Sequence, residues 1–215
     1  MALKVNEIFH SIQGESTYAG QPCVFIRLTG CNLRCSYCDT TYAYEEGSFL
    51  EAEEIVEKVK GFGCSLVEVT GGEPLIQNET PELIRTLLDL DYSVLLETNG
   101  SKDIGIADKR CVKIVDIKCP SSGEEKSNDF ENLNRLDKGD ELKLIIADRT
   151  DYDFAIDIIS RISEGRKKGI HIHFSPCFGE IEPRELAEWI LNDRLNVRLN
   201  LQLHKYVWPP DMRGV

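Results

Sequence analysis

Short apolar runs rich in valine and isoleucine alternate along this chain with stretches whose apolar residues fall on one face of a helix. Runs that are apolar on both faces are typical of buried parallel strands, and their alternation with helices is typical of α/β folds. The expected strands cover 24–28, 66–70, 93–97, 112–117, 142–146 and 170–174, with a possible seventh at 197–203, and the expected helices cover 51–60, 81–90, 153–162 and 183–191.

The number of expected strands falls short of a closed barrel. Eight strands and eight helices take about 250 residues, whereas this chain has 215. We therefore predict a partial, open α/β barrel of about six parallel strands. It would form a single domain over residues 1–215, with an N-terminal extension over about residues 1–22. The middle of segment 116–143 is rich in small and charged residues and is expected to form a surface excursion.

Charge and cysteine content narrow the function. The 37 acidic and 25 basic residues give a net charge of −12, which repels a polyanion, so direct binding of nucleic acid is not expected. The chain shows neither a secretion signal nor an apolar run of about 18 residues, which predicts a cytoplasmic protein that does not enter a membrane. Eight cysteines in such a chain indicate a metal or cofactor site in preference to a disulfide framework.

Three of the cysteines are closely spaced. Cys31, Cys35 and Cys38 directly follow the first expected barrel strand, so one loop can wrap a cluster. Thiolates are the usual ligands of iron–sulfur clusters, and a four-iron cubane held by three of them leaves one iron open to a substrate or cofactor. The alternatives are a zinc site completed by Asp39 or a distant cysteine, and structural cysteines without a ligand.

A second motif follows another expected strand. Residues 71–74 read Gly-Gly-Glu-Pro and come directly after Thr70, and paired glycines permit a close approach of the backbone. Polar groups also follow two further strands, at 97–100 and at Asp116 and Lys118. Because α/β barrels build their sites at the carboxyl ends of the strands, we expect these groups to share one site.

A CxxxCxxC loop after a strand, together with the Gly-Gly-Glu-Pro element, resembles the radical S-adenosylmethionine superfamily. The resemblance implies one 4Fe-4S cluster on Cys31, Cys35 and Cys38, with S-adenosylmethionine on the open iron. Reductive cleavage of that cofactor would give a 5'-deoxyadenosyl radical, so no side chain is expected to be the catalytic group. The residues implied in cofactor binding are Tyr37, Cys38, Asp39, Gly72, Glu73, Asp116, Ile117, Lys118, Ser175 and Pro176.

Within that superfamily, the N-terminal Ser-Ile-Gln-Gly-Glu at 11–15 and the closing Gln-Leu-His-Lys-Tyr at 202–206 resemble the 7-carboxy-7-deazaguanine synthase family. The resemblance implies ring contraction of 6-carboxy-5,6,7,8-tetrahydropterin to 7-carboxy-7-deazaguanine with loss of ammonia, for queuosine or another 7-deazapurine. It also implies a magnesium ion on Thr40, an electron donor such as flavodoxin, and a homodimer. The N-terminal extension would bind substrate, and the residues implied are Ile12, Gln13, Gly14, Glu15, Arg27, Thr70 and Pro209.

Three points stay open at this stage. Members of the family can end near the proline after the closing motif, whereas this chain continues to Val215, so we expect Pro209 to reach the substrate through its backbone alone. One alternative function is an activating enzyme for a glycyl-radical enzyme, which would need an open protein-binding face. The other is a non-catalytic iron–sulfur or zinc module, in which the Gly-Gly-Glu-Pro element would be accidental.

Overall fold

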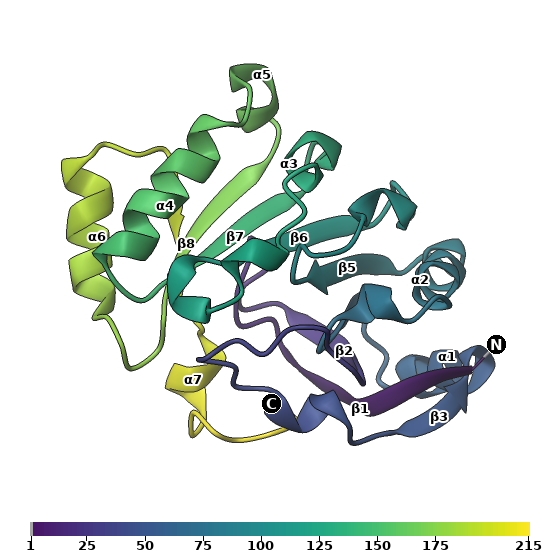
Figure 1. Ribbon diagram of the computed structural model, residues 1–215. Coiled ribbons are helices and arrows are strands. Elements are labelled where there is room, and N and C mark those ends of the chain that lie inside the picture. Colours follow the sequence, from purple (N-terminus) through teal and green to yellow (C-terminus); the bar gives the residue numbers. More distant parts are fainter. Residues whose placement is uncertain (1) are drawn as a thin grey trace.

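The computed structural model describes residues 2–215, without the side chain of Arg166, and its strands form one sheet of nine (Figure 1). The order across the sheet is β3-β1-β2-β4-β5-β6-β7-β8-β9. From β2 to β9 neighbouring strands run parallel, whereas β1 is antiparallel to both β2 and β3. The strands are β1 (Ala2–Ile12), β2 (Pro22–Leu28), β3 (Ser48–Glu51), β4 (Leu66–Gly71), β5 (Ser93–Thr98), β6 (Val112–Ile117), β7 (Glu141–Ile146), β8 (His171–Pro176) and β9 (Arg198–Leu199).

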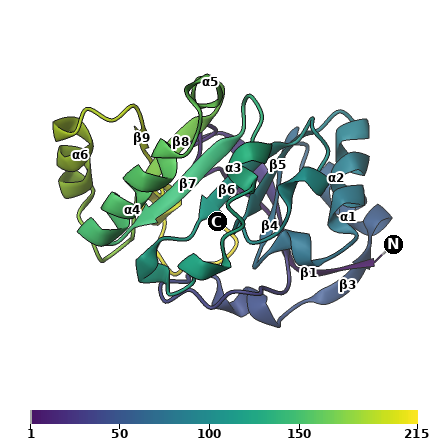
Figure 2. The ribbon, with the colours of Figure 1, turned by 45° about the horizontal axis from the view of Figure 1, so that its top comes forward.

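The longer helices pack on the outer side of this sheet, around the strands in both views (Figures 1 and 2). The helices are α1 (Ala52–Gly61), α2 (Thr80–Asp89), α3 (Asn132–Arg135), α4 (Arg149–Ser160), α5 (Glu164–Lys167), α6 (Pro183–Asn192) and α7 (His204–Val207). Single 3-10 turns lie at η1 (Thr41–Tyr44), η2 (Pro74–Ile76), η3 (Ile104–Ile106), η4 (Pro120–Ser122) and η5 (Glu125–Ser127). Within residues 2–215, no helix is both long and apolar enough to cross a bilayer.

Alternate residues of each parallel strand face opposite sides of the sheet. The outward residues, such as Val67 and Val69 of β4, join the helices in the main core. On the inner, concave side a second and smaller core forms the base. Its buried members are Cys23, Phe25, Leu66, Leu95 and Ile114.

Polar residues take over on the concave side nearer the carboxyl ends of the strands. Four strands each carry an apolar residue of the base and, two positions later in the sequence, a polar residue that lines a cavity. The concave side therefore has an apolar base and, at the carboxyl ends of the strands, a polar rim that we call the polar mouth. The four polar residues are Arg27 of β2, Glu68 of β4, Glu97 of β5 and Asp116 of β6.

The open, mostly parallel α/β sheet confirms the predicted fold class, and each of the six expected strands is present. The possible seventh is reduced to the two residues of β9. The prediction missed β1, although β1 lies inside the expected extension over residues 1–22 and pairs with β2. Its mixture of polar and apolar residues carries no continuous apolar run, because β1 pairs near the edge of the sheet and many of its residues are only half-buried.

The segment between β6 and β7 differs from the expected surface excursion. Leu133 and Leu136 are buried in the main core, and the backbone of Ser122 accepts a hydrogen bond from Ser36 N–H at 3.0 Å. The middle of this segment thus supports the loop that carries the three cysteines.

Replacing Leu96, a fully buried residue of β5, tests the main core. Leu96→Ala is expected to lower the free energy of unfolding by about 2–5 kcal/mol, because it removes apolar contacts and leaves a cavity. The same change at Leu191, which is 74% exposed, is expected to cost within about 0.5 kcal/mol. Urea denaturation measures both variants, and equal losses would contradict this description of the core.

Candidate active site

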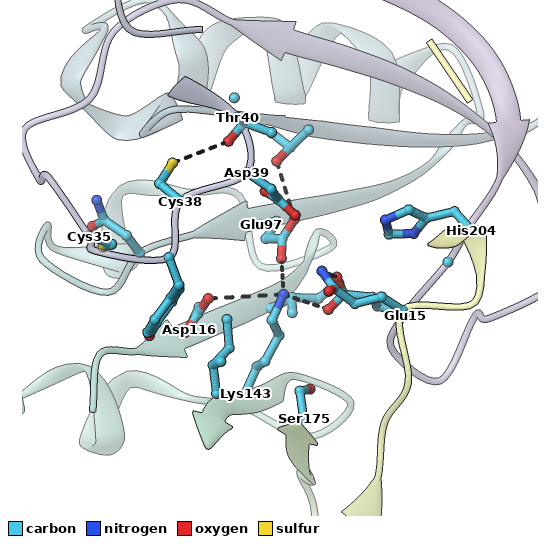
Figure 3. Close-up of a pocket in the computed structure, with 18 of the residues that line it drawn as sticks. Glu15, Cys35, Cys38, Asp39, Thr40, Glu97, Asp116, Lys143, Ser175 and His204 are labelled. Atoms are coloured by element: carbon cyan, nitrogen blue, oxygen red, sulfur yellow. Dashed lines mark hydrogen bonds and ion pairs between the residues drawn. The ribbon is translucent and has the colours of Figure 1, made fainter. Parts of the chain in front are cut away.

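A cavity of about 560 Å³ opens at the carboxyl ends of the parallel strands (Figure 3). Its wall combines four parts of the chain that are far apart in sequence: the cysteine loop, residues 12–16 after β1, the strand ends, and residues 202–205 near the C-terminus. The volume lies within the range of small-molecule sites. The geometry therefore brings most of the predicted site residues together.

Cys31, Cys35 and Cys38 all line this cavity. The Cys31 sulfur accepts from Leu33 N–H at 3.4 Å and from the Asn99 amide at 3.8 Å, which suits a thiolate. Burial raises the pKa of Cys35 to about 11, so a bound metal must displace the proton of this thiol.

The cysteine loop places three sulfur donors on one cavity. Among the described residues, no three His, Cys, Asp or Glu side chains converge closely enough to hold one metal ion. A four-iron cluster distributes its thiolates over different irons, so they need not converge on one point. The donor set therefore fits a 4Fe-4S cluster.

The paired glycines bring the end of β4 against the cysteine loop. A Cβ at Gly72 would lie 2.2 Å from the Gly30 carbonyl oxygen and 2.7 Å from Cys31 Cβ. Because neither backbone nor ligand can yield, only glycine fits here. Gly72 thus lies on the cavity wall beside the cysteines, as the motif indicated.

Glu73 takes a different place from the one predicted. It is fully buried and does not line the cavity, and its carboxylate accepts from Thr98 Oγ1 at 2.8 Å and Asn99 N–H at 2.7 Å. The side chain therefore ties the end of β4 to the end of β5 from behind the wall. This position indicates a positioning role for Glu73, and the expected contact between its carboxylate and the cofactor stays a prediction.

The end of β6 supplies polar groups without partners. Lys118 Nζ donates to Asp116 Oδ2 at 2.9 Å, whereas Asp116 Oδ1 and Tyr37 Oη are buried without a hydrogen-bond partner among the described residues. Buried polar atoms are nearly always satisfied, so these two are suited to a ligand. The side chain of Ile117 lies in the main core, so the predicted contact of this residue with the cofactor would be through its backbone. Ser175 and Pro176 lie on the wall as predicted, and Ser175 Oγ accepts from Asn200 at 3.0 Å.

Lys143 of β7 lies at the centre of the polar mouth, 7% exposed (Figure 3). Its ammonium is 2.6 Å from Glu15 Oε2, 2.7 Å from Glu97 Oε1 and 4.0 Å from Asp116 Oδ2. Burial alone would lower the pKa of Lys143, but the Glu15 and Glu97 carboxylates raise it well above the usual value. The ammonium therefore stays charged and holds residues from three strands and from the segment after β1.

Glu68 of β4 binds Gln13, which lies in the same segment after β1 as Glu15. Gln13 Nε2 donates to Glu68 Oε2, and Gln13 Oε1 accepts from Glu15 N–H at 2.8 Å. Burial first, and then the charge of Glu97, raises the pKa of Glu68 well above its usual value, which favours the protonated carboxyl. The side chains of Gln13 and Glu15 are thus engaged by protein partners within the cavity wall.

Arg27 and Thr70 also line the cavity as predicted. Arg27 Nε donates to Glu7 Oε1 at 2.8 Å and forms an ion pair with this carboxylate. Among the described residues, this guanidinium donates a hydrogen bond through Nε and none through its two terminal nitrogens. These two nitrogens are therefore available to a ligand carboxylate. Thr70 Oγ1 lies 3.3 Å from Glu97 Oε2.

The C-terminal residues correct one prediction. Pro209 is exposed and lies off the cavity wall, whereas His204, Lys205 and Val215 are on it. The His204 ring packs on Gly14, where a Cβ would lie 2.0 Å from His204 Nδ1. The residue that reaches the cavity after the closing motif is therefore Val215 and not Pro209.

Comparison with known proteins agrees with this site. The model of the radical SAM superfamily matches residues 25–116. The 7-carboxy-7-deazaguanine synthase of Chlorobaculum tepidum is 48% identical over 99% of this chain and 97% of that protein, and the enzyme of the same name from Koribacter versatilis is 42% identical over 99% and 100%. QueE from Escherichia coli has the same fold, with a TM-score of 0.80 and 24% identity over 95% of each chain.

The fold and the site define a radical S-adenosylmethionine enzyme, whose superfamily works with a 4Fe-4S cluster and S-adenosylmethionine. The identity of 48% and 42% to full-length relatives identifies the family within this superfamily. The chain belongs to the 7-carboxy-7-deazaguanine synthase family, which confirms the resemblance read from the motifs and does not favour a glycyl-radical activating enzyme.

The raised pKa of Glu68 can be tested by replacing this residue with glutamine. Because the folded-state pKa is raised, the stability that protonated Glu68 contributes is complete at low pH and is lost as the pH rises from about 4.5 through the folded-state pKa. Glu68→Gln has no proton to lose, so its free energy of unfolding should increase relative to that of the wild type as the pH rises above about 4.5. Urea denaturation across this range measures the difference, and two parallel pH curves would contradict a raised pKa.

Proposed function

We infer that this chain converts 6-carboxy-5,6,7,8-tetrahydropterin to 7-carboxy-7-deazaguanine with loss of ammonia, as a radical S-adenosylmethionine carbon–nitrogen lyase of 7-deazapurine biosynthesis, with queuosine as the expected end product. The observation that carries this inference is that three cysteines and the polar mouth of the sheet share one cavity, in a chain 48% identical to a synthase of that name. We propose that residues 1–215 act as one domain, because β1 of the N-terminal extension pairs with barrel strand β2.

The two sides of the cavity suit two different ligands. Beside the cysteines, Tyr37, Gly72, Asp116, Lys118 and Ser175 would bind S-adenosylmethionine, which supplies the hydrogen-abstracting radical when the reduced cluster cleaves it. The orphaned oxygens of Tyr37 and Asp116 support this assignment. Lys118 stays paired with Asp116 and fixes the orientation of that carboxylate.

The opposite side would bind the pterin. The terminal nitrogens of Arg27 suit the substrate carboxylate, since a planar guanidinium can bind two oxygens at once. Residues 12–14 line this side of the cavity, and Thr70 adds a hydroxyl. In this assignment Gln13 and Glu15 shape the wall through Glu68 and Lys143.

We propose that Thr40 holds a magnesium ion between the two ligands. Its hydroxyl lines the cavity, 3.7 Å from the Cys38 sulfur, and a hard oxygen ligand suits this cation. We also propose an electron donor such as flavodoxin and a homodimer, both expected from the family.

Removing the Thr40 hydroxyl tests the magnesium assignment. Thr40→Ala is expected to raise the magnesium concentration for half-maximal rate by about tenfold, because one oxygen ligand is lost, while the iron content is unchanged. Thr41→Ala is the matched control, since that neighbouring side chain is exposed. Rates measured across a magnesium titration decide, and an unshifted curve for Thr40→Ala would refute the assignment.

The function itself is tested by an anaerobic reaction of cluster-loaded protein with reductant, S-adenosylmethionine, magnesium and 6-carboxytetrahydropterin. Mass spectrometry is expected to detect 7-carboxy-7-deazaguanine with S-adenosylmethionine largely unconsumed. Cys35→Ala should lose iron and all product, whereas Cys64→Ala, whose cysteine lies off the cavity, should keep both. Accumulation of 5'-deoxyadenosine without the deazaguanine would overturn the substrate, and a loaded cluster that yields neither compound would favour a non-catalytic module.

A further inference from the structure

Residues 200–208, here called the C-terminal segment, cross the mouth of the cavity. None of the residues of α7, all of which are described, is buried, and Tyr206 and Val207 are 57% and 55% exposed. An element with so few apolar contacts depends on its polar contacts to stay in place.

One side of the C-terminal segment is fixed by hydrogen bonds. The amide of Gln202 donates to Glu15 Oε1 at 3.0 Å, and Leu203 N–H donates to the Gly14 carbonyl at 2.7 Å. Asn200 adds the bond to Ser175 Oγ described above. These contacts attach the segment to the residues after β1 and to the end of β8.

The other side is fixed by an ion pair with the cysteine loop. Lys205 Nζ lies 2.7 Å from Asp39 Oδ2, and the Lys205 side chain is 9% exposed. The same ammonium lies 5.2 Å from the centre of the Phe178 ring, which covers it with a favourable aromatic face. Asp39 stands between Cys38 and Thr40, so this pair connects the C-terminal segment to the cluster and magnesium ligands.

His204 lies between these two attachments. Its ring packs on the Gly14 backbone within the cavity wall, on the side assigned to the pterin. Figure 3 shows the ring pointing toward the cavity from the C-terminal segment, across from Glu15 and Asp39. A displacement of Lys205 would therefore move the neighbouring His204 out of the wall.

We propose that Lys205 is a positioning residue whose ion pair with Asp39 clamps the C-terminal segment across the cavity and thereby holds His204 in the pterin-binding wall. The consequence for substrate binding rests on the proposed function, whereas the clamp itself is a property of the chain before any substrate binds. In this account Asp39 acts through Lys205 and not as a direct ligand of the cofactor.

Hydrogen exchange of the cluster-loaded protein without substrate tests the clamp. Amides of residues 203–208 are expected to exchange about tenfold faster in Lys205→Met and in Asp39→Asn, with little further change in the double variant, because both remove the same interaction. Lys60→Met is the matched control, since it removes a pair of the same length, 2.7 Å from Glu57, on an exposed helix surface. Exchange at the wild-type rate in Lys205→Met, or additive effects of the two changes, would overturn the proposal.

Kinetics separates positioning from the other roles. Lys205→Met is expected to raise KM for the pterin by about tenfold with a smaller change in kcat, and Lys205→Arg should restore KM, because a guanidinium can also pair with Asp39. If Lys205→Met speeds hydrogen exchange in the C-terminal segment but leaves KM unchanged, the proposed effect on His204 is refuted. If the wild type itself makes no deazaguanine, the proposed function fails, and the exchange rates still decide the clamp.

Discussion

The ammonium of Lys143 binds the carboxylates of Glu15 and Glu97 inside the concave face of the sheet, and the shape of the cavity depends on this contact. Each of these charges would be costly to bury alone, and carboxylates so close together would repel one another. With the ammonium between them they form a stable polar mouth above the apolar base. Glu15 also accepts from Gln202, so the same contact extends to the C-terminal segment.

Two further constraints complete the site from outside this mouth. Gly72 allows the end of β4 to touch the cysteine loop, and Glu73 behind it fixes the end of β5. The cysteine loop, the strand ends and the segment after β1 are therefore joined to the sheet by direct contacts. Such fixed positions suit radical chemistry, where position and exclusion of water are the contributions of the protein.

Sequence patterns predicted the strands and longer helices because apolar runs and helical periodicity report burial directly. They missed Glu68 and Lys143, which lie inside strands that were read for their apolar residues. For Glu68 the available signal was a charge two positions beyond Leu66 of the concave base, whereas Lys143 follows Glu141 and carried no such signal. Motifs did not predict that the side chains of Glu73 and Ile117 are buried behind the cavity wall, because a motif places a backbone near a site and does not determine where the side chain points. Those directions follow from strand pairing, which is a tertiary property.

The most direct test of this account is the affinity of cluster-loaded Lys143→Met for 6-carboxytetrahydropterin, measured by anaerobic calorimetry. It shows whether the buried ammonium of Lys143 holds the pterin-binding side of the cavity in place. Our account predicts an affinity at least about tenfold weaker with unchanged iron content, because Glu15 and Glu97 lose their shared partner. Lys113→Met is the control and should leave the affinity unchanged. It breaks a buried ion pair with Asp140, 3.0 Å away, and neither residue of that pair lines the cavity. Wild-type affinity in Lys143→Met would contradict the account.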